Sequence, residues 1–164
     1  MRSNDFAVGS WVIYPSHGVG KLEKIEKITI DGSSIDMFVI SFGKSGLTLK
    51  IPVTKAISAG LRHTMSKDAL NNVYDVLKKK IKKKKTMWSK RAQDYETKIN
   101  SGDLSSIASV VRELYKEGGE IMLSFSERQV YNMAMERLAK EFSIIENIGE
   151  EEAVTRLEEV MKAA

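Results

Sequence analysis

Residues 35–52 read Ile-Asp-Met-Phe-Val-Ile-Ser-Phe-Gly-Lys-Ser-Gly-Leu-Thr-Leu-Lys-Ile-Pro, and they decide the fold of the N-terminal part of the chain. Side chains alternate along 35–40, where both faces are apolar, and along 47–51, where Thr48 and Lys50 occupy the second face. One-residue alternation predicts β-strands. The break at 43–46, Gly-Lys-Ser-Gly, has the composition of a turn, so the sequence predicts consecutive antiparallel strands.

The residues on either side extend the same pattern. An apolar strand is predicted at Trp11–Tyr14 before Pro15, a turn at 31–34 (Asp-Gly-Ser-Ser), and an end to the last strand at Pro52. Short antiparallel strands without intervening helices predict a small, strongly bent sheet or partly open barrel. Its edge strands have unpaired backbone groups that a partner strand can use.

From Ser66 onward the apolar period becomes helical. Helices are predicted over five stretches: Leu70 to Leu77, about Trp88 to Asn100, Asp103 to before Gly118, Ser124 to before Gly149, and Glu150 to Lys162. Asp103 is a good N-cap, and Ser124-Phe-Ser-Glu127 has the pattern of a capping box. The second half is therefore predicted to be a compact helical domain.

A basic segment precedes the second of these helices. Residues 78–91 hold nine lysines and arginines, one tryptophan and no acidic residue. Residues 66–102 contain 11 basic and 4 acidic side chains, whereas 103–164 contain 7 and 13. Concentrated positive charge favours binding to nucleic acid phosphates, and the neighbouring Trp88 can stack on bases or wedge between them.

The composition bounds the class of protein. The 164 residues are 42% hydrophobic, as in folded proteins, and include no cysteine and only two histidines, His17 and His63. Disulfides and thiolate metal sites are therefore excluded. Neither a signal-peptide pattern nor eighteen consecutive apolar residues occur, so we expect a soluble, cytoplasmic protein without a membrane partner.

We do not expect an enzyme or a cofactor. The sequence offers no set of nucleophile, base and orienting group. The segment 17–20, His-Gly-Val-Gly, superficially resembles a phosphate-binding loop. It lacks the lysine and the following helix that such loops require, so a turn between strands is predicted.

Motifs in both halves of the sequence resemble one known family. The motifs of the N-terminal half are Val12-Ile-Tyr-Pro15, His17-Gly-Val-Gly20 and Lys50-Ile-Pro52. Those of the second half are Trp88-Ser-Lys-Arg91, Lys98-Ile-Asn-Ser-Gly-Asp103, Val110-Val-Arg-Glu-Leu-Tyr115 and Leu123-Ser-x-x-Glu-Arg128. Their order is similar to that in the CarD/CdnL family of bacterial RNA-polymerase-binding transcription regulators. The first half also resembles the module that this family shares with transcription-repair coupling factors, so the resemblance covers nearly all of the chain.

The resemblance implies an α+β protein of two domains. Residues 1–62 would form a small Tudor-like antiparallel β-barrel that binds RNA polymerase. Residues 63–86 would form a connecting helix and a lysine-rich linker, and residues 87–164 a compact all-α DNA-binding domain. We expect a monomer.

The implied function is regulation of transcription initiation. The barrel would bind the RNA polymerase β subunit of the holoenzyme. The helical domain would bind promoter DNA in the minor groove near the upstream edge of the −10 element and stabilise the open complex. The DNA-binding residues expected from the resemblance are Trp88, Lys90 and Arg91, which occupy the family's Trp-x-basic-basic positions, together with Lys85 and Arg128. The polymerase-binding residues are Lys50, Pro52, Val39 and Lys27.

Simpler interpretations accompany these predictions. A lysine run is usually a solvated segment, and a lone tryptophan at a helix start usually anchors a core. Lys50 is also of the type that blunts an exposed sheet edge. The alternative function is that of a general RNA-binding or ribosome-associated protein, because stacking and phosphate contacts serve RNA as well as DNA.

Overall fold

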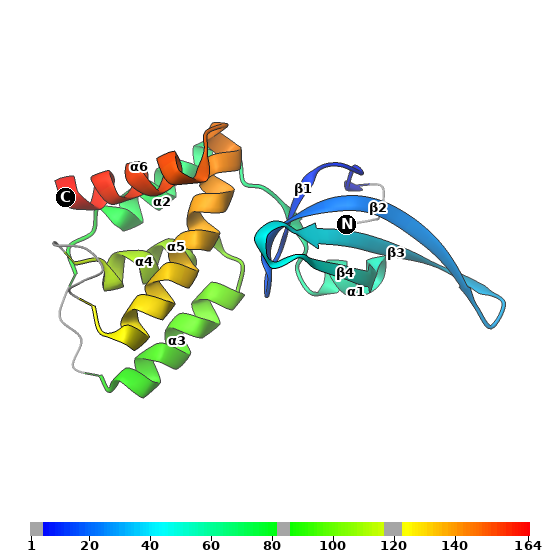
Figure 1. The fold of residues 1–164 in the computed structure, drawn as a ribbon, viewed down its shortest axis with the longest axis horizontal. Helices are drawn as coiled ribbons and strands as arrows, with labels where there is room; N and C mark the ends of the chain where they lie inside the picture. Colours follow the sequence, from blue (N-terminus) through cyan, green and yellow to red (C-terminus); the bar gives the residue numbers. More distant parts are fainter. Residues whose placement is uncertain (1–4, 82–85, 117–122) are drawn as a thin grey trace. The chain divides into compact units, whose positions relative to one another are not determined.

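The chain folds into two compact units, Met1–Thr64 and Met65–Ala164. The structure is a computed structural model that describes residues 5–81, 86–116 and 123–164 (Figure 1). Among the described residues, the first unit contains the strands and the second contains five α-helices, so the α+β class is confirmed. The second unit includes a helix from the predicted connecting segment, Leu70–Leu77.

The first unit is built on a five-stranded antiparallel sheet. Its strands are β1 (Trp11–Tyr14), β2 (Gly18–Ile30), β3 (Ser33–Phe42), β4 (Leu47–Pro52) and β5 (Arg62–His63). Their spatial order is β4-β3-β2-β1-β5. Because β4 and β5 are both edges, the sheet is open over the described residues, and closure into the predicted Tudor-like barrel is not found. With only two residues, β5 is too short to form an extended ladder with β4.

A long hairpin joins β2 to β3. Ile30 pairs with Ser33, and the two residues between them have positive φ angles, 49° at Asp31 and 77° at Gly32. This two-residue loop matches the right-handed twist of the flanking strands, which explains the Asp-Gly pair at the predicted turn. The segment 17–20 is likewise a turn entering a strand, as predicted, since the His17 amide donates to the Tyr14 carbonyl.

One face of the sheet is covered by a short helix, α1 (Val53–Ser58), which places Val53 and Ala56 in the core. The opposing strands contribute Leu22, Phe38 and Ile40, each fully buried. Gly20 allows the strands to approach closely on this side, because an added Cβ would lie 2.6 Å from the Ile40 side chain. The sequence pattern does not predict α1.

The helices of the second unit match the predicted stretches closely. They are α2 (Leu70–Leu77), α3 (Trp88–Asn100), α4 (Leu104–Leu114), α5 (Phe125–Glu146) and α6 (Glu150–Ala163). The predicted caps are confirmed: Asp103 accepts a 3.0 Å hydrogen bond from the Ser106 amide, and Ser124 and Glu127 form the capping box. Over the described ranges, no helix has the length and apolarity needed to cross a membrane.

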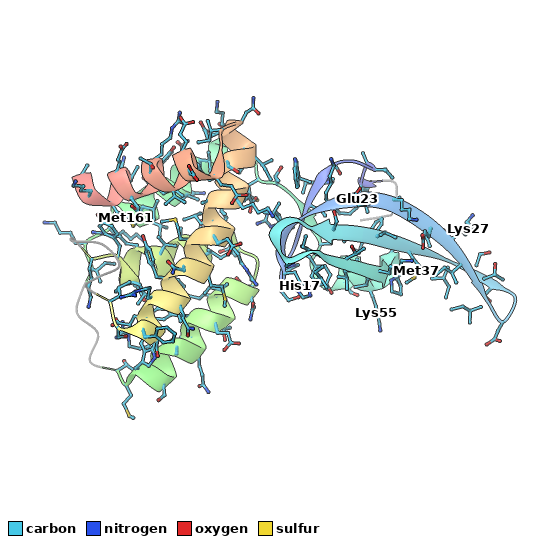
Figure 2. The ribbon with its side chains drawn as sticks, in the orientation of Figure 1. His17, Glu23, Lys27, Met37, Lys55 and Met161 are labelled. Carbon is cyan, nitrogen blue, oxygen red and sulfur yellow. The ribbon has the colours of Figure 1, made fainter. Side chains whose placement is uncertain are left out.

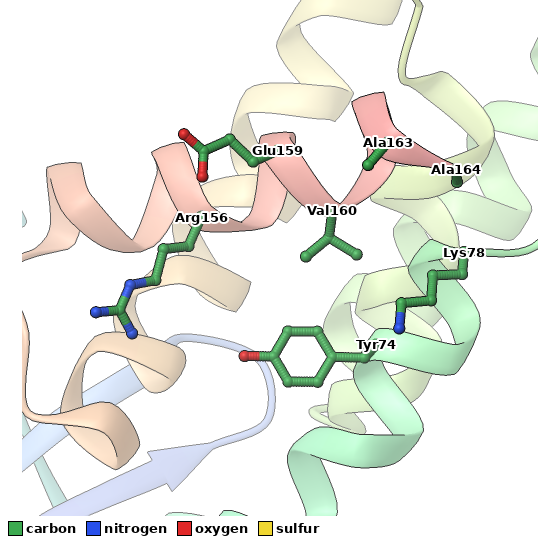
Figure 3. A pocket seen from close by; sticks show the side chains of 7 residues that line it. All are labelled: Tyr74, Lys78, Arg156, Glu159, Val160, Ala163 and Ala164. Carbon is green, nitrogen blue, oxygen red and sulfur yellow. The ribbon is translucent and has the colours of Figure 1, made fainter.

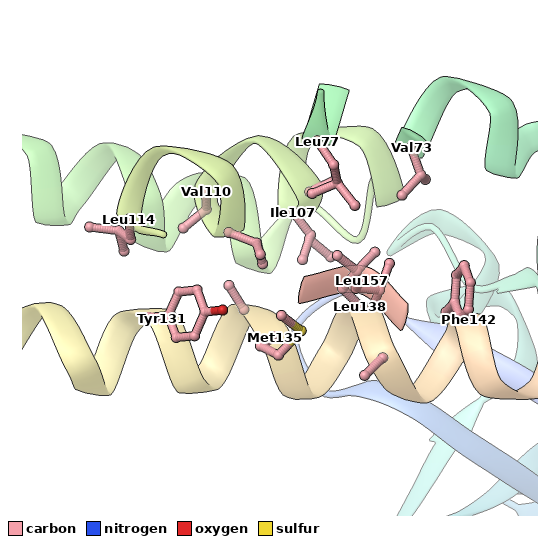
Figure 4. Close-up of a cluster of buried hydrophobic side chains, with 14 of the residues drawn as sticks. Val73, Leu77, Ile107, Val110, Leu114, Tyr131, Met135, Leu138, Phe142 and Leu157 are labelled. Carbon is pink, nitrogen blue, oxygen red and sulfur yellow. The ribbon is translucent and has the colours of Figure 1, made fainter. Parts of the chain in front are cut away.

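The core of the helical unit lies where α4 and α5 meet α2 and α6 (Figure 4). Leu138 and Phe142 of α5 are fully buried, as are Val73 and Leu77 of α2. Burial of side chains of this size contributes roughly 1.5–3 kcal/mol each. This core gives α3, which packs against both α4 and α5, a rigid support.

Candidate nucleic-acid and partner-binding interfaces

The helix α3 begins with an uncapped turn. Its N-cap is Met87, whose side chain makes no capping hydrogen bond. The first backbone N–H groups of a helix have no intrahelical acceptor, and the helix dipole adds partial positive charge there. The start of α3 can therefore accept an anionic group such as a phosphate.

Trp88 is the first residue of α3. It is half-buried and packs against the helical core, with its ring centroid 6.1 Å from that of Tyr95. The guanidinium carbon of Arg91 lies 5.6 Å from the Trp88 ring centroid. Trp88 thus anchors the start of the helix on the core while the residue remains partly exposed.

The cations predicted to contact DNA have different surroundings. Lys90 is exposed, whereas Arg91 is half-buried and donates a 2.9 Å hydrogen bond to the Tyr95 hydroxyl. Arg128, near the start of α5, is also half-buried, and its Nε atom has no hydrogen-bond partner among the described residues. Lys85 lies outside the described residues.

The starts of α3 and α5 lie at the same end of the helical unit. Arg137 of α5 donates a 3.0 Å hydrogen bond to the carbonyl oxygen of Ile99, at the far end of α3. At the near end, the charge of Arg91 acts on the carboxyl group of Glu127, one turn into α5. The two helices therefore run side by side with their positive ends together.

This end also has two exposed apolar side chains that the sequence analysis did not identify. Met87 is 75% exposed, and Phe125, the first residue of α5, is 71% exposed. The sequence does contain a signal for the exposure of Phe125, since it directly follows the N-cap residue Ser124. Side chains at that position project from the end of the helix. We call Met87, Trp88, Lys90, Arg128 and Phe125 the helix-end site.

In the first unit, three of the predicted polymerase-binding residues share one face of the sheet. Val39 lies directly opposite Lys50, and Met37 lies directly opposite Pro52. Directly opposed residues point to the same face of a sheet, and so do residues two apart on one strand, so all four share one face. This outer face is opposite the core, which contains Phe38. Val39 is 4% exposed, whereas Pro52 is half-buried.

Charged side chains surround Val39 on the outer face. Lys24 and Lys50 both pair with Val39, and both contact Glu26, at 2.7 Å and 3.5 Å respectively. The hydrogen bond from Lys24 lowers the pKa of the Glu26 carboxyl group, and the charge of Lys50 acts in the same direction. Two lysines sharing one carboxylate leave a net positive charge beside the exposed edge strand β4.

The structure separates Lys27 from this group. Lys27 pairs with Asp36, whereas the adjacent Glu26 pairs with Met37, so Lys27 lies on the opposite face of the hairpin from Lys50. It is exposed on the outer part of β2 (Figure 2). Lys50 and Pro52 can contact one partner surface together, with the buried Val39 between the two lysines that pair with it, while Lys27 faces away from that surface.

A pocket of about 530 Å³ lies elsewhere in the helical unit (Figure 3). It is lined by residues of α2 and α6 and of the segments that follow them: Tyr74, Lys78, Arg156, Glu159, Val160, Ala163 and Ala164. No described residue of the helix-end site lines it.

Comparison with known proteins identifies both units. Residues 6–65 match the family described as "CarD-like/TRCF RID domain", and residues 72–158 match "CarD, C-terminal domain". The chain is also similar to "Putative transcription factor YdeB" of Bacillus subtilis (strain 168), with 29% identity over 147 residues. That alignment covers 90% of this chain and 96% of the relative.

These matches agree with the motifs in both halves of the sequence, and they point to transcription regulation instead of an enzyme family. The two matched ranges correspond closely to the two structural units. The chain belongs to the CarD/CdnL family of transcription regulators.

Proposed function

We propose that this protein binds the RNA polymerase β subunit through the outer face of its sheet and promoter DNA through the helix-end site. It would act in the cytoplasm, on polymerase at the nucleoid, and stabilise the open complex. DNA contact would fall in the minor groove near the upstream edge of the −10 element. The single observation that carries this proposal is the accessible Trp88 at the uncapped, cationic start of α3, in a chain with both CarD domains.

The helix-end site has the chemistry that an unstacked base step requires. Aromatic or apolar wedges insert between bases at a cost of a few kcal/mol per step, and adjacent cations hold the phosphates. Here Trp88 and Phe125 supply apolar rings, and Lys90 supplies an exposed ammonium group beside two helix N-termini. Lys85 and Arg128 remain predicted phosphate contacts.

The outer face supports the polymerase side of the proposal. Lys50 is 58% exposed and belongs to β4, an edge strand with backbone groups available to a partner strand. An acidic partner side chain would compete with Glu26 for Lys50. Lys27 remains a predicted contact whose location on the other face requires a separate test.

The protein stabilises the open complex only if it binds open promoter DNA more tightly than closed promoter DNA. A ligand that binds closed and open promoter DNA equally shifts nothing, however tightly it binds. Trp88 can distinguish the two forms, because a ring gains a stacking surface only where a base step is already open. Binding to polymerase would raise the effective concentration of the helical unit at the promoter.

The decisive measurement is open-complex lifetime with purified holoenzyme, with and without this protein. We expect the protein to lengthen the lifetime and Trp88→Ala to remove most of that effect while polymerase binding persists. Base stacking on an aromatic residue is worth about 1–3 kcal/mol, so the change should be on the order of tenfold. An unchanged lifetime with the folded wild-type protein would refute the proposal.

One observation favours a second candidate, RNA binding. Trp11 on β1 is 41% exposed, and the ammonium group of Lys21 lies 5.7 Å from its ring centroid. An exposed ring beside a cation on a sheet is a feature of single-strand binders. Trp11→Ala should leave open-complex stabilisation intact, and a loss of binding to single-stranded RNA would favour this second function.

A further inference from the structure

Arg91 contacts both aromatic rings at the start of α3. Its guanidinium carbon lies 5.6 Å from the ring centroid of Trp88 and 5.6 Å from that of Tyr95. The two rings are 6.1 Å apart and tilted by 54°. Residues 88, 91 and 95 follow one another at helical spacing, so the three side chains form one packed column along the same face of α3.

Tyr95 is the fixed end of this column. It is 1% exposed, and its hydroxyl accepts a 2.9 Å hydrogen bond from Nη2 of Arg91. Burial raises the pKa of the Tyr95 hydroxyl, and the carboxyl group of Glu113 on α4 acts in the same direction. A neutral phenol held between α3 and α4 therefore fixes the position of the guanidinium group.

The guanidinium group of Arg91 is directed toward the protein interior. Its Nε atom is buried and has no hydrogen-bond partner among the residues described. Its charge acts on the carboxyl group of Glu127 on α5. A cation that donates a hydrogen bond to a phenol and lies over two ring faces has little freedom to reach a phosphate, in contrast to the adjacent exposed Lys90.

Trp88 needs such support, because it occupies the first position of its helix and the N-cap residue before it, Met87, makes no capping hydrogen bond with its side chain. We infer that Arg91 is a positioning residue, which acts on promoter DNA by holding the indole ring of Trp88 in a fixed orientation. This inference rests on the proposed function, and it replaces a direct phosphate contact by Arg91. Holding the ring in advance reduces the entropy lost when it enters the DNA.

The salt dependence of DNA binding separates the two roles. Each phosphate contact adds about 0.9 to the slope of log K against log salt concentration. We expect Lys90→Gln to lower the slope by about this amount and Arg91→Ala to leave it unchanged. We also expect Arg91→Ala to shorten the lifetime of the open complex about tenfold, as expected for the loss of one base stack. This effect should be close to that of Trp88→Ala. Arg91→Lys, which keeps a cation near the rings, should recover part of this loss.

The orientation of Trp88 can be measured without DNA. The chain has two tryptophans, so in a Trp11→Phe background all indole fluorescence comes from Trp88. Arg91→Ala and Tyr95→Phe should increase acrylamide quenching of Trp88, while Lys90→Gln should not. Circular dichroism of each variant would show that the helices persist.

Two results would overturn the inference. One is a slope that falls equally in Arg91→Ala and Lys90→Gln, since Arg91 would then contact a phosphate. The other is unchanged quenching in folded Arg91→Ala. If Trp88→Ala itself has no effect on the open complex, the proposed function fails, and the quenching experiment still decides whether Arg91 holds the ring.

Discussion

The Nε atom of Arg112 on α4 donates a 2.7 Å hydrogen bond to the carbonyl oxygen of Lys79, two residues beyond the end of α2. The last carbonyl groups of a helix have no intrahelical donor, so this contact satisfies a group near the helix end. It also fixes where the lysine run begins, since Lys78, Lys79 and Lys80 are exposed around it. The first three lysines of the run are therefore held at a defined point on the helical unit.

Replacing these three lysines by glutamine should weaken DNA binding in a salt-dependent way. The slope of log K against log salt concentration should fall by about 0.9 for every lysine that contacts a phosphate. Lys162→Gln, which removes an exposed lysine from α6, is the matched control and should leave the slope unchanged. An unchanged slope in the triple variant would mean that Lys78–Lys80 form only a solvated surface.

Lys50→Glu should abolish most binding to RNA polymerase, because it reverses a charge on the outer face and places a carboxylate close to Glu26. We expect a loss of at least about tenfold, corresponding to 1.4 kcal/mol, with DNA binding by the helical unit retained. Binding of the variant to immobilised polymerase measures this directly.

Lys27→Glu is the comparison for that experiment, since it makes the same charge reversal on the opposite face of the hairpin. We expect a much smaller loss from Lys27→Glu than from Lys50→Glu. Equal losses would show that the polymerase contacts both faces of β2 and β3.

Phe125→Ser should reduce stabilisation of the open complex while leaving the fold intact. The side chain is 71% exposed, so its removal costs little core packing, and Ser124 and Glu127 retain the capping box. Open-complex lifetime and thermal unfolding of the same preparation test both parts. Full activity in Phe125→Ser would confine the DNA contact to Trp88 and its neighbours on α3.

The helices could be predicted from sequence because their end signals are local. Asp103 and the Ser124–Glu127 pair are within one turn of the amides they satisfy, so α4 and α5 begin where expected. The helix α1 lacks such a signal: it has six residues, follows Pro52, and is held by packing Val53 and Ala56 on the sheet. Tertiary contacts of that kind are not visible in a single sequence.

The face on which Lys27 lies also could not be read from the sequence. Strict alternation from the buried Leu22 would place residue 27 on the outer face. The register of β2 shifts between Leu22 and Lys24, and this irregularity exchanges the two faces for the rest of the strand. The same shift brings Lys24 and Glu26 beside Lys50, so the ion pairs of the outer face depend on one bulge.

The capping box of α5 should make stability depend on pH. Burial acts to raise the pKa of Glu127, but hydrogen bonds with Ser124, together with the charges of Lys116 and Arg91, outweigh it and hold the pKa below 4.5. A folded-state pKa below the unfolded value stabilises the protein above pH 4.5, and this stabilisation is lost as the pH falls through the folded-state value. Glu127→Gln keeps a hydrogen-bond acceptor but loses the charge.

We therefore expect Glu127→Gln to unfold more easily than the wild-type protein at pH 7, by about 0.5–1 kcal/mol, the scale of a charge at a helix N-terminus. The difference should shrink as the pH falls from 4.5 through the lowered folded-state pKa, because the wild-type carboxyl group then loses its charge. Urea unfolding at pH 7 and at pH 3 measures both values, with Glu159→Gln on the exposed side of α6 as the control. A difference of the same size at both pH values would show that the charge of Glu127 does not contribute to stability.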